Sequence, residues 1–296
     1  MKIYITGILG MLGYNIAETL KDRCDIVGMD ALDLEVEGMK YWKGSLFDHE
    51  GVEADILKEK PDVLIHTAAL VNVDKCEEEP KSAEKLNALV TKDLAEICGK
   101  NSIKMIYIST DAVFDGEDSR LYTENDLTNP VNIYGVTKLN GEKYVLAYKR
   151  NVVLRTNIYG KNLQNKKSFG EWIYDELSNS NTINMFSDID FSPILANELA
   201  EIIYMVIEKD IEGLYHACGT GCITKYDFGV KLKEIFGIET GQIIKTTSES
   251  ANFRAKRSKH MGMSNEKLKK LLDIHISTPE ESIYKFCRIM EDKNGN

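Results

Sequence analysis

Residues 1–13, Met-Lys-Ile-Tyr-Ile-Thr-Gly-Ile-Leu-Gly-Met-Leu-Gly, decide the fold of this chain. Lys2 to Thr6 are rich in β-forming side chains and predict a strand, and helical periodicity follows from Tyr14 to Lys21. Glycines between the two elements allow a tight turn, close approach of backbone amides to a pyrophosphate, and close packing of the helix on the strand. The stretch therefore predicts a dinucleotide site that includes Gly7, Gly10, Met11, Leu12 and Gly13.

A second predicted strand, Asp25 to Met29, ends at Asp30, twenty residues after Gly10. In a doubly wound α/β fold, an acidic residue at this position accepts hydrogen bonds from the adenosine ribose. Ala31 and Leu32 follow, so no arginine stands there to meet a 2′-phosphate. We expect NAD(H) or NADP(H), with NAD(H) favoured, although an aspartate in an ordinary strand-end turn would look the same.

Strands and helices continue to alternate along the first half of the chain. Pro61 to Ala69 predicts a buried strand, Lys81 to Lys100 a long helix, and Lys104 to Ile108 a further strand. Right-handed connections would place all strand ends at one edge of a parallel sheet, where ligands bind. The small residues that end the first of these strands would leave room for the cofactor; they are Thr67, Ala68 and Ala69.

Tyr134 and Lys138 stand four residues apart in a segment with a helical pattern, which puts both side chains on one helix face. A nearby ammonium favours the ionised form of a phenol, whose ordinary pKa is about 10. The pair could then exchange a proton with a carbonyl or an alcohol, while Thr110 at a strand end orients the substrate oxygen. An amphipathic surface helix and a turn cap would show the same residues. The glycine turn favours catalysis by Thr110, Tyr134 and Lys138.

These motifs together resemble the extended short-chain dehydrogenase/reductase superfamily, and within it the dTDP-4-dehydrorhamnose reductase group. The resemblance covers the first 160 residues and rests on Gly7/Gly10/Gly13, Val73-Asp74-Lys75, Ser109 to Gly116, Tyr134 to Glu142, and Arg155-Thr156. It implies a Rossmann domain, a bound nicotinamide cofactor, and reduction of the 4-keto group of a nucleotide-linked 6-deoxy sugar. Lys138 would also hold the nicotinamide ribose.

The resemblance implies further contacts on both ligands. On the cofactor side they are Leu46, Phe47 and Asn87, and on the substrate side Val71, Asp74, Asn157, Arg254 and Arg257. The two arginines belong to a basic run, residues 251–260, which suits a diphosphate but also fits a solvated surface segment. Asn157 to Gly160 stands where these reductases usually carry Ser-Trp-Val-Tyr-Gly, so the identity of the sugar stays open.

Two other functions remain alternatives. Ala112 stands where sugar-nucleotide dehydratases carry a glutamate, which disfavours dehydration, but a nucleotide-sugar epimerase could use the same three catalytic residues. A rival from another class is a non-catalytic, cofactor-binding regulatory subunit, since the regulatory subunit of methionine adenosyltransferase resembles this group.

The 296 residues suffice for one large or two modest domains. We expect a Rossmann domain over residues 1–156, to which the chain returns around 193–217, and a smaller α/β substrate domain in most of 157–296. The last four residues, 293–296, predict a frayed tail.

The composition limits the partners. The 37 basic and 47 acidic residues leave a formal net charge of −10, which disfavours nucleic acid and anionic membranes. We find no signal peptide, membrane-spanning run, metal-ligand spacing or disulfide framework among the six cysteines, which predicts a cytoplasmic protein without a metal. A homodimer, through the helices that hold Asn87 and Tyr134, is implied by the family resemblance alone.

Overall fold

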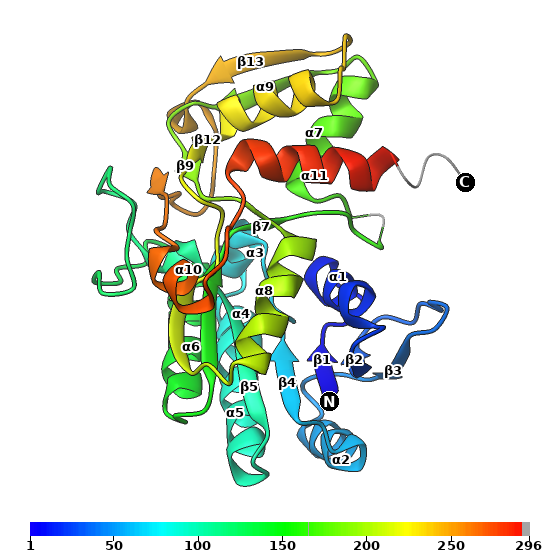
Figure 1. Cartoon of the computed structure of the whole chain (residues 1–296). Coiled ribbons are helices and arrows are strands. Elements are labelled where there is room, and N and C mark those ends of the chain that lie inside the picture. The colour runs from blue at the N-terminus through cyan, green and yellow to red at the C-terminus, as the bar shows by residue number, and fades with distance from the viewer. Residues whose placement is uncertain (165, 292–296) are drawn as a thin grey trace.

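A seven-stranded, all-parallel sheet forms the centre of the larger body in the computed structural model, which describes residues 1–164 and 166–291 (Figure 1). The predicted tail therefore lies outside the described residues. In spatial order the strands are β11 (Gly213–His216), β6 (Val152–Thr156), β5 (Lys104–Thr110), β4 (Val63–His66), β1 (Lys2–Thr6), β2 (Asp25–Asp30) and β3 (Lys40–Lys43).

Both faces of this sheet are covered by helices, because successive side chains of each strand point to opposite faces. In β1, Ile3 and Ile5 enter one apolar core and Tyr4 enters the other. The first core is closed by α1 (Met11–Leu20), α8 (Ala196–Glu208) and α10 (Glu266–Leu272), and the second by α2 (His49–Glu59), α5 (Val90–Lys100) and α6 (Ile133–Leu146). This arrangement confirms the predicted doubly wound α/β fold.

The long helix predicted over residues 81–100 is present but is interrupted. It consists of α4 (Pro80–Glu84), a π-helical turn η1 (Lys85–Leu89) and α5. Asn87 lies in the π turn, and its side chain hydrogen-bonds both backbone groups of Leu70, accepting from the N–H at 2.8 Å and donating to the carbonyl at 3.1 Å. Single π turns within α-helices often mark functional sites, and this one ties the helix to the loop after β4. A short helix, α3 (Val73–Glu78), connects the two.

The smaller body lies above the carboxyl edge of the sheet (Figure 1). It contains α7 (Phe169–Ser178), β8 (Thr182–Phe186), α9 (Lys225–Ile235), β13 (Gln242–Thr246) and α11 (Pro279–Glu291), with β8 and β13 paired in parallel. Its core is rich in aromatic side chains, among them Tyr159, Phe228 and Phe286. Thr224 caps α9, since its hydroxyl accepts a hydrogen bond from Asp227 N at 3.0 Å.

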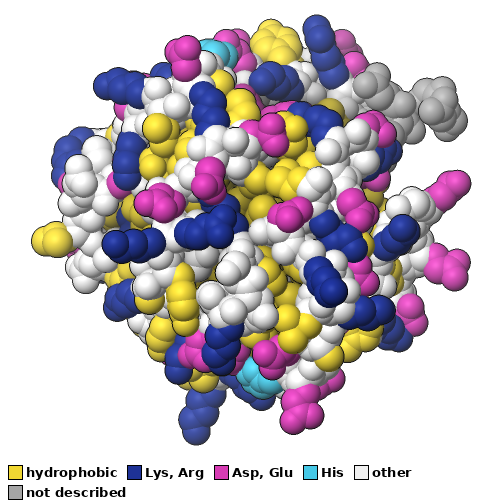
Figure 2. Space-filling model, turned by 60° about the horizontal axis from the view of Figure 1, so that its bottom comes forward, with side chains coloured by type: hydrophobic (Ala, Val, Ile, Leu, Met, Phe, Trp, Pro, Cys, Tyr) yellow, Lys and Arg dark blue, Asp and Glu magenta, His cyan; other side chains and the backbone are white. Residues whose placement is uncertain are grey.

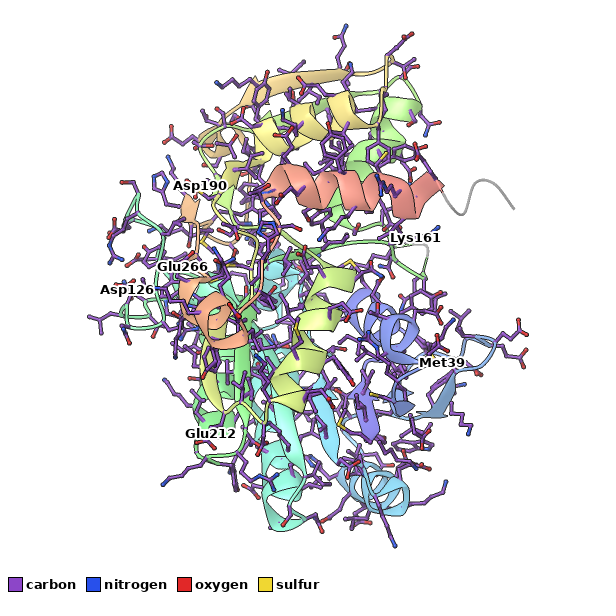
Figure 3. All side chains as sticks on the ribbon, viewed as in Figure 1. Met39, Asp126, Lys161, Asp190, Glu212 and Glu266 are labelled. Carbon is purple, nitrogen blue, oxygen red and sulfur yellow. The ribbon has the colours of Figure 1, made fainter. Side chains whose placement is uncertain are left out.

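Short elements join the two bodies. They are β7 (Ile158–Tyr159), β9 (Asp190–Phe191), β10 (Ile194–Leu195), β12 (Ile223–Thr224), β14 (His260–Met261), η2 (Asp111–Val113) and η3 (Ser248–Ser250). Lys161 follows β7 at the level where the bodies meet (Figure 3), and its carbonyl accepts a hydrogen bond from Asn15 of α1 at 2.8 Å. The second half also completes the main sheet, because β11 pairs with β6.

The surface carries both charge signs. On the face drawn in Figure 2, Lys and Arg side chains alternate with Asp and Glu, and apolar side chains show between them in the middle of the face. Within residues 1–164 and 166–291, no helix has both the length and the apolar character needed to cross a membrane.

Candidate active site

Two adjoining cavities lie at the carboxyl edge of the sheet. One has a volume of about 600 Å³ and the other about 460 Å³. They share part of their walls, namely Met11, Leu12, Thr67, Ala69, Val71 and Ile158. An extended ligand could therefore run from one cavity into the other.

The smaller cavity has the features of a dinucleotide site. Gly7 has a φ of +74°, which favours glycine, and a Cβ on Gly13 would lie 2.2 Å from the Gly7 carbonyl oxygen. Gly10 precedes α1 and provides no side-chain cap, so the first amides of the helix are open to an anion. The predicted residues Gly7, Gly10, Met11, Leu12, Asp30, Leu46, Phe47, Thr67, Ala68 and Ala69 all line this cavity. The residues present therefore fit a nicotinamide dinucleotide.

Asp30 has backbone partners of its own in this cavity. Its two carboxylate oxygens accept hydrogen bonds from Leu9 N and Leu32 N, both at 3.0 Å. Each oxygen keeps a lone pair for a further donor. Lys166 and Lys167 line the same cavity from the far side of the chain, which the sequence analysis missed because these lysines lie more than 130 residues after Asp30.

Thr110, Tyr134 and Lys138 all line the larger cavity. Thr110 ends β5, while α6 carries the other two side chains and begins after Asn132, whose side chain accepts a hydrogen bond from Gly135 N at 2.9 Å. The Thr110 hydroxyl also accepts from Ala112 N at 3.1 Å, so it caps the turn η2 and faces the cavity at once. The structure thus brings the three predicted side chains together.

Burial changes the acidity of both ionisable groups of this trio. Lys138 is 3% exposed, its Nζ donates to the Ile108 carbonyl at 2.7 Å, and burial lowers its pKa to about 7. Burial raises the pKa of Tyr134 above its ordinary value, and a hydrogen bond with Thr110 opposes that rise. The four-residue spacing predicts that Lys138 lowers the pKa of the Tyr134 phenol. In the protein alone burial outweighs any such effect.

A buried ion pair lies directly behind these residues. Arg155 on β6 contacts Glu142 on α6 with two hydrogen bonds, Nε to Oε1 at 2.9 Å and Nη2 to Oε2 at 2.7 Å. Ser109, which precedes Thr110 on β5, donates to the same carboxylate at 2.5 Å. The pair therefore connects the three elements that carry the site.

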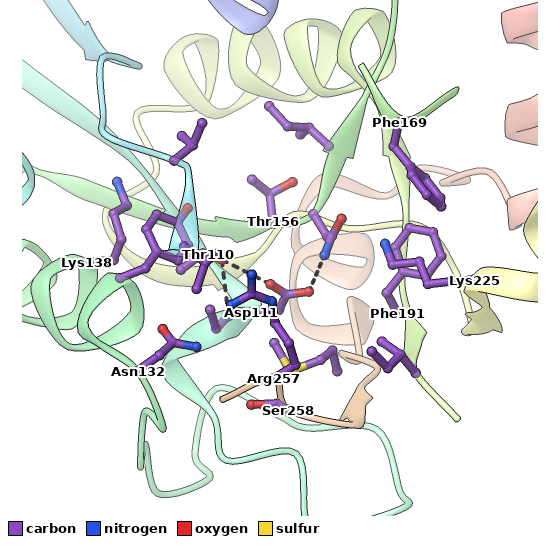
Figure 4. A pocket seen from close by; sticks show the side chains of 18 of the residues that line it. Thr110, Asp111, Asn132, Lys138, Thr156, Phe169, Phe191, Lys225, Arg257 and Ser258 are labelled. Atoms are coloured by element: carbon purple, nitrogen blue, oxygen red, sulfur yellow. Dashed lines mark hydrogen bonds between the residues drawn. The ribbon is translucent and has the colours of Figure 1, made fainter. Parts of the chain in front are cut away.

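The far end of the larger cavity is built from segments that are distant in the sequence (Figure 4). Asp111 is buried and accepts hydrogen bonds from Thr110 at 3.0 Å and from Asn157 Nδ2 at 2.5 Å. Burial raises the pKa of Asp111, and these two donors and the charge of Lys225 oppose the rise. Burial lowers the pKa of Lys225 to about 7. Thr156 also lines this end.

The other predicted substrate residues divide into two groups. Val71, Asn157 and Arg257 line the larger cavity. Asp74 instead accepts from Arg257 at 2.9 Å and from Ala255 N at 2.9 Å, and Arg254 forms an exposed ion pair with Glu78 at 2.5 Å. Asp74 and Arg254 thus lie beside the cavity wall, where they hold the basic run 251–260 against α3.

Asn87, predicted to bind the cofactor, is 1% exposed and bonds Leu70 and Thr137. It holds the loop after β4 rather than lining either cavity. In the part of the chain that the structure describes, no group of three His, Cys, Asp or Glu residues is placed to hold a metal ion.

Four further residues line the larger cavity without having been predicted from the sequence: Asp111, Phe169, Phe191 and Lys225. Asp111 follows Thr110 directly, so its position could have indicated a role. No comparable signal exists for Lys225. The direction of its side chain depends on the pairing of β12 with β9, which the local sequence does not indicate.

Known proteins resemble this chain over most of its length. The family model for the RmlD substrate binding domain matches residues 1–291. A dTDP-4-dehydrorhamnose reductase from Aggregatibacter actinomycetemcomitans is 29% identical over 244 residues, which cover 78% of each chain. Methionine adenosyltransferase 2 subunit beta from Rattus norvegicus is 30% identical over 299 residues, which cover 96% of this chain and 88% of the relative.

The likeness extends to three dimensions. The crystal structure of dTDP-4-dehydrorhamnose reductase from Bacillus anthracis in complex with NADP matches with a TM-score of 0.88 at 26% identity, covering 98% of this chain and 99% of the other. Sequence, fold and the arrangement of the cavity residues thus agree. The chain belongs to the RmlD substrate binding domain family, within the extended short-chain dehydrogenase/reductase superfamily.

Proposed function

We propose that this protein reduces the 4-keto group of a dTDP-linked 6-deoxy sugar with NADH or NADPH. The observation that carries the proposal is that Thr110, Tyr134 and Lys138 line a cavity that adjoins a second cavity with the features of a dinucleotide site. The names of the related reductases support the same reaction and the same class of substrate.

A nicotinamide cofactor, held by the glycine turn and Asp30 in the smaller cavity, would supply the hydride for the sugar ketone. Tyr134 donates its phenolic proton to the ketone oxygen, and the Thr110 hydroxyl shares a hydrogen bond with that oxygen. Lys138, held by the Ile108 carbonyl, stabilises the phenolate that is left. Residues 1–156 would hold the cofactor, and most of 157–296 would bind the sugar nucleotide, with Arg257 at its diphosphate.

The preference for NAD(H) is part of the proposal. The Asp30 carboxylate in the smaller cavity favours a free ribose hydroxyl over a 2′-phosphate on the adenosine part of the cofactor. Lys166 and Lys167 in the same cavity would offset the negative charge of a 2′-phosphate, so we expect only a modest preference for NAD(H) over NADP(H). The ratio of kcat/KM with NADH to that with NADPH measures it, and a ratio below one would contradict the assignment.

We also propose that the protein is a cytoplasmic homodimer that associates through the helices carrying Asn87 and Tyr134. Exposed apolar side chains on these helices support an interface; they are Leu89, Val136 and Leu146. The molar mass measured by light scattering during gel filtration tests the proposed dimer.

The test of the mechanism is Tyr134→Phe, which removes one hydroxyl. We expect kcat to fall about 10²- to 10⁴-fold while the Kd for NADH is unchanged. Tyr144→Phe is the matched control, since Tyr144 lies on the same helix, outside both cavities. Equal rates for Tyr134→Phe and the wild type would overturn the mechanism. One cofactor oxidised per product distinguishes a reductase from an epimerase.

A second candidate is a non-catalytic subunit that binds a nicotinamide cofactor. It is favoured by the 30% identity to methionine adenosyltransferase 2 subunit beta over 96% of this chain. Binding of NADH without reduction of any dTDP-linked or other nucleotide-linked keto sugar would support this candidate. Stoichiometric oxidation of NADH by dTDP-4-dehydrorhamnose would exclude it.

A further inference from the structure

Lys225 is a cation at the wall of the larger cavity that no step of the proposed mechanism uses. It is the first residue of α9, and its backbone N–H donates to the Ile189 carbonyl at 2.9 Å, which fixes the start of the helix against β9. Its side chain lies between two phenylalanine rings, with Nζ 3.2 Å from the ring centre of Phe191 and 4.4 Å from that of Phe169. Figure 4 shows it on the side of the cavity that faces Asp111.

The aromatic faces favour the ammonium but do not satisfy its three N–H donors. Within residues 1–164 and 166–291, Lys225 Nζ donates no hydrogen bond to a protein acceptor, although other lysines of the chain do so, such as Lys138 and Lys233. An ammonium that is held in place with unused donors is suited to bind an acceptor on a ligand.

Asp111 supplies the complementary acceptor. Its carboxylate already accepts from Thr110 and Asn157, one on each oxygen, and each oxygen has capacity for one more hydrogen bond. Because Asp111 follows Thr110 directly, the space between Asp111 and Lys225 adjoins the position where the ketone would react. The sugar ring, and not the nucleoside, would occupy that space.

We propose that Lys225 is the residue that selects the sugar, by donating a hydrogen bond to a ring hydroxyl that in turn donates to Asp111. This inference rests on the proposed function of the site. A hydroxyl both accepts and donates, so it matches a wall with one cationic donor and one carboxylate. A diphosphate does not match, because its negative charges would meet the buried carboxylate of Asp111. Arg257 lines the cavity elsewhere and pairs with Asp74, which is only partly buried, so Arg257 is the better candidate for the diphosphate.

The test compares the binding of dTDP-rhamnose and of dTDP by calorimetry. Lys225→Met removes the ammonium but keeps an unbranched apolar side chain between the rings. Lys231→Met is the control on the same helix, because Lys231 pairs with Glu234 and Glu280 outside the cavity. We expect Lys225→Met to weaken dTDP-rhamnose about 10- to 100-fold, as for a hydrogen bond from a charged group, and to leave dTDP and NADH unchanged. Lys225→Arg should recover part of the loss.

Other results would overturn the proposal. Equal weakening of dTDP and dTDP-rhamnose assigns Lys225 to the diphosphate, and unchanged affinity for both makes it a packing residue. If Lys225→Met melts more than a few degrees below the wild type, Lys225→Arg decides: weaker binding of dTDP-rhamnose with unchanged affinity for dTDP supports the proposal, and unchanged affinity for both or loss of dTDP affinity overturns it. If the wild type reduces dTDP-4-dehydrorhamnose and Lys225→Met keeps wild-type affinity for dTDP-rhamnose, this inference is wrong but the proposed function stands. If the wild type binds dTDP-rhamnose no more tightly than dTDP and shows no turnover, the proposed function is wrong too.

Discussion

The two adjoining cavities, which form the dinucleotide end and the sugar end of the site, are built from different parts of the chain. The dinucleotide end is formed mainly by the turns that follow β1, β2, β3 and β4, within the first 70 residues, and Lys166 and Lys167 line it from the second half of the chain. The sugar end is formed by long side chains from separate segments, among them Asp111, Asn157, Phe191, Lys225 and Arg257. A site made of backbone tolerates few sequences, whereas a site made of side chains can change its ligand one residue at a time. The cofactor site and the sugar site can therefore diverge independently.

The largest effect should come from the buried ion pair that connects β5, β6 and α6. We expect Arg155→Met to lower the free energy of unfolding by about 3–5 kcal/mol, because it leaves Glu142 charged, buried and without its main partner. Affinity for NADH and for dTDP should fall together. Urea denaturation measures the loss. Arg254→Met, at an exposed pair, is the control, and a similar loss in both variants would contradict this role.

A smaller effect should be confined to the dinucleotide end. Gly13→Ala would place a Cβ 2.2 Å from the Gly7 carbonyl oxygen and 2.7 Å from Ile8 Cα, both backbone atoms. We expect a loss of about 1–3 kcal/mol in unfolding free energy, with weaker NADH binding and unchanged dTDP binding. Gly10→Ala, whose Cβ meets the same oxygen at 3.1 Å, should lose less. Equal losses would show that the glycine turn relaxes freely.

Changes of pH should act on stability through Lys138, which lines the larger cavity. The pKa of Lys138 is about 7 when folded and near 10.4 when unfolded, so the unfolded chain binds more protons between these values. Stability contributed by this residue therefore rises with pH across that window, by up to about 1.4 kcal/mol per pH unit. The unfolding free energy of the wild type minus that of Lys138→Met should increase from pH 7 to 9.5. A flat difference would contradict the lowered pKa.

The smallest effects should separate the two arginines of the basic run. Arg257 lines the cavity, so Arg257→Ala should raise KM for the sugar nucleotide about 10-fold or more. Arg254 is 63% exposed at its side chain, and its ion pair with Glu78 should contribute less than about 1 kcal/mol to stability. Steady-state kinetics should show less than a twofold change for Arg254→Ala. A larger change would support the original prediction that both arginines bind the diphosphate.

Sequence alone was sufficient for features that depend on local spacing. The glycine turn, the parallel sheet, and the positions of Thr110, Tyr134 and Lys138 all follow from patterns within a few residues. The π turn at Asn87 could not be predicted, since it depends on the amide reaching Leu70. The direction of the Lys225 side chain could not be predicted either, because it is set by the pairing of β12 with β9, about thirty residues earlier in the chain. Electrostatics were equally hidden, because burial, which no motif encodes, raises the pKa of Tyr134.

The pairing of β11 with β6 has a consequence during synthesis. A nascent chain that has emerged only to residue 156 already contains the three proposed catalytic side chains. Its newest strand, β6, is still an open edge, and the part of the sheet face that α8 will cover, beside α1, is bare. Unpaired edges and bare apolar faces invite association with other chains. The ribosome must deliver sixty more residues, through His216, before this half of the molecule can close, so folding has to wait for the sugar-binding segment to pass through.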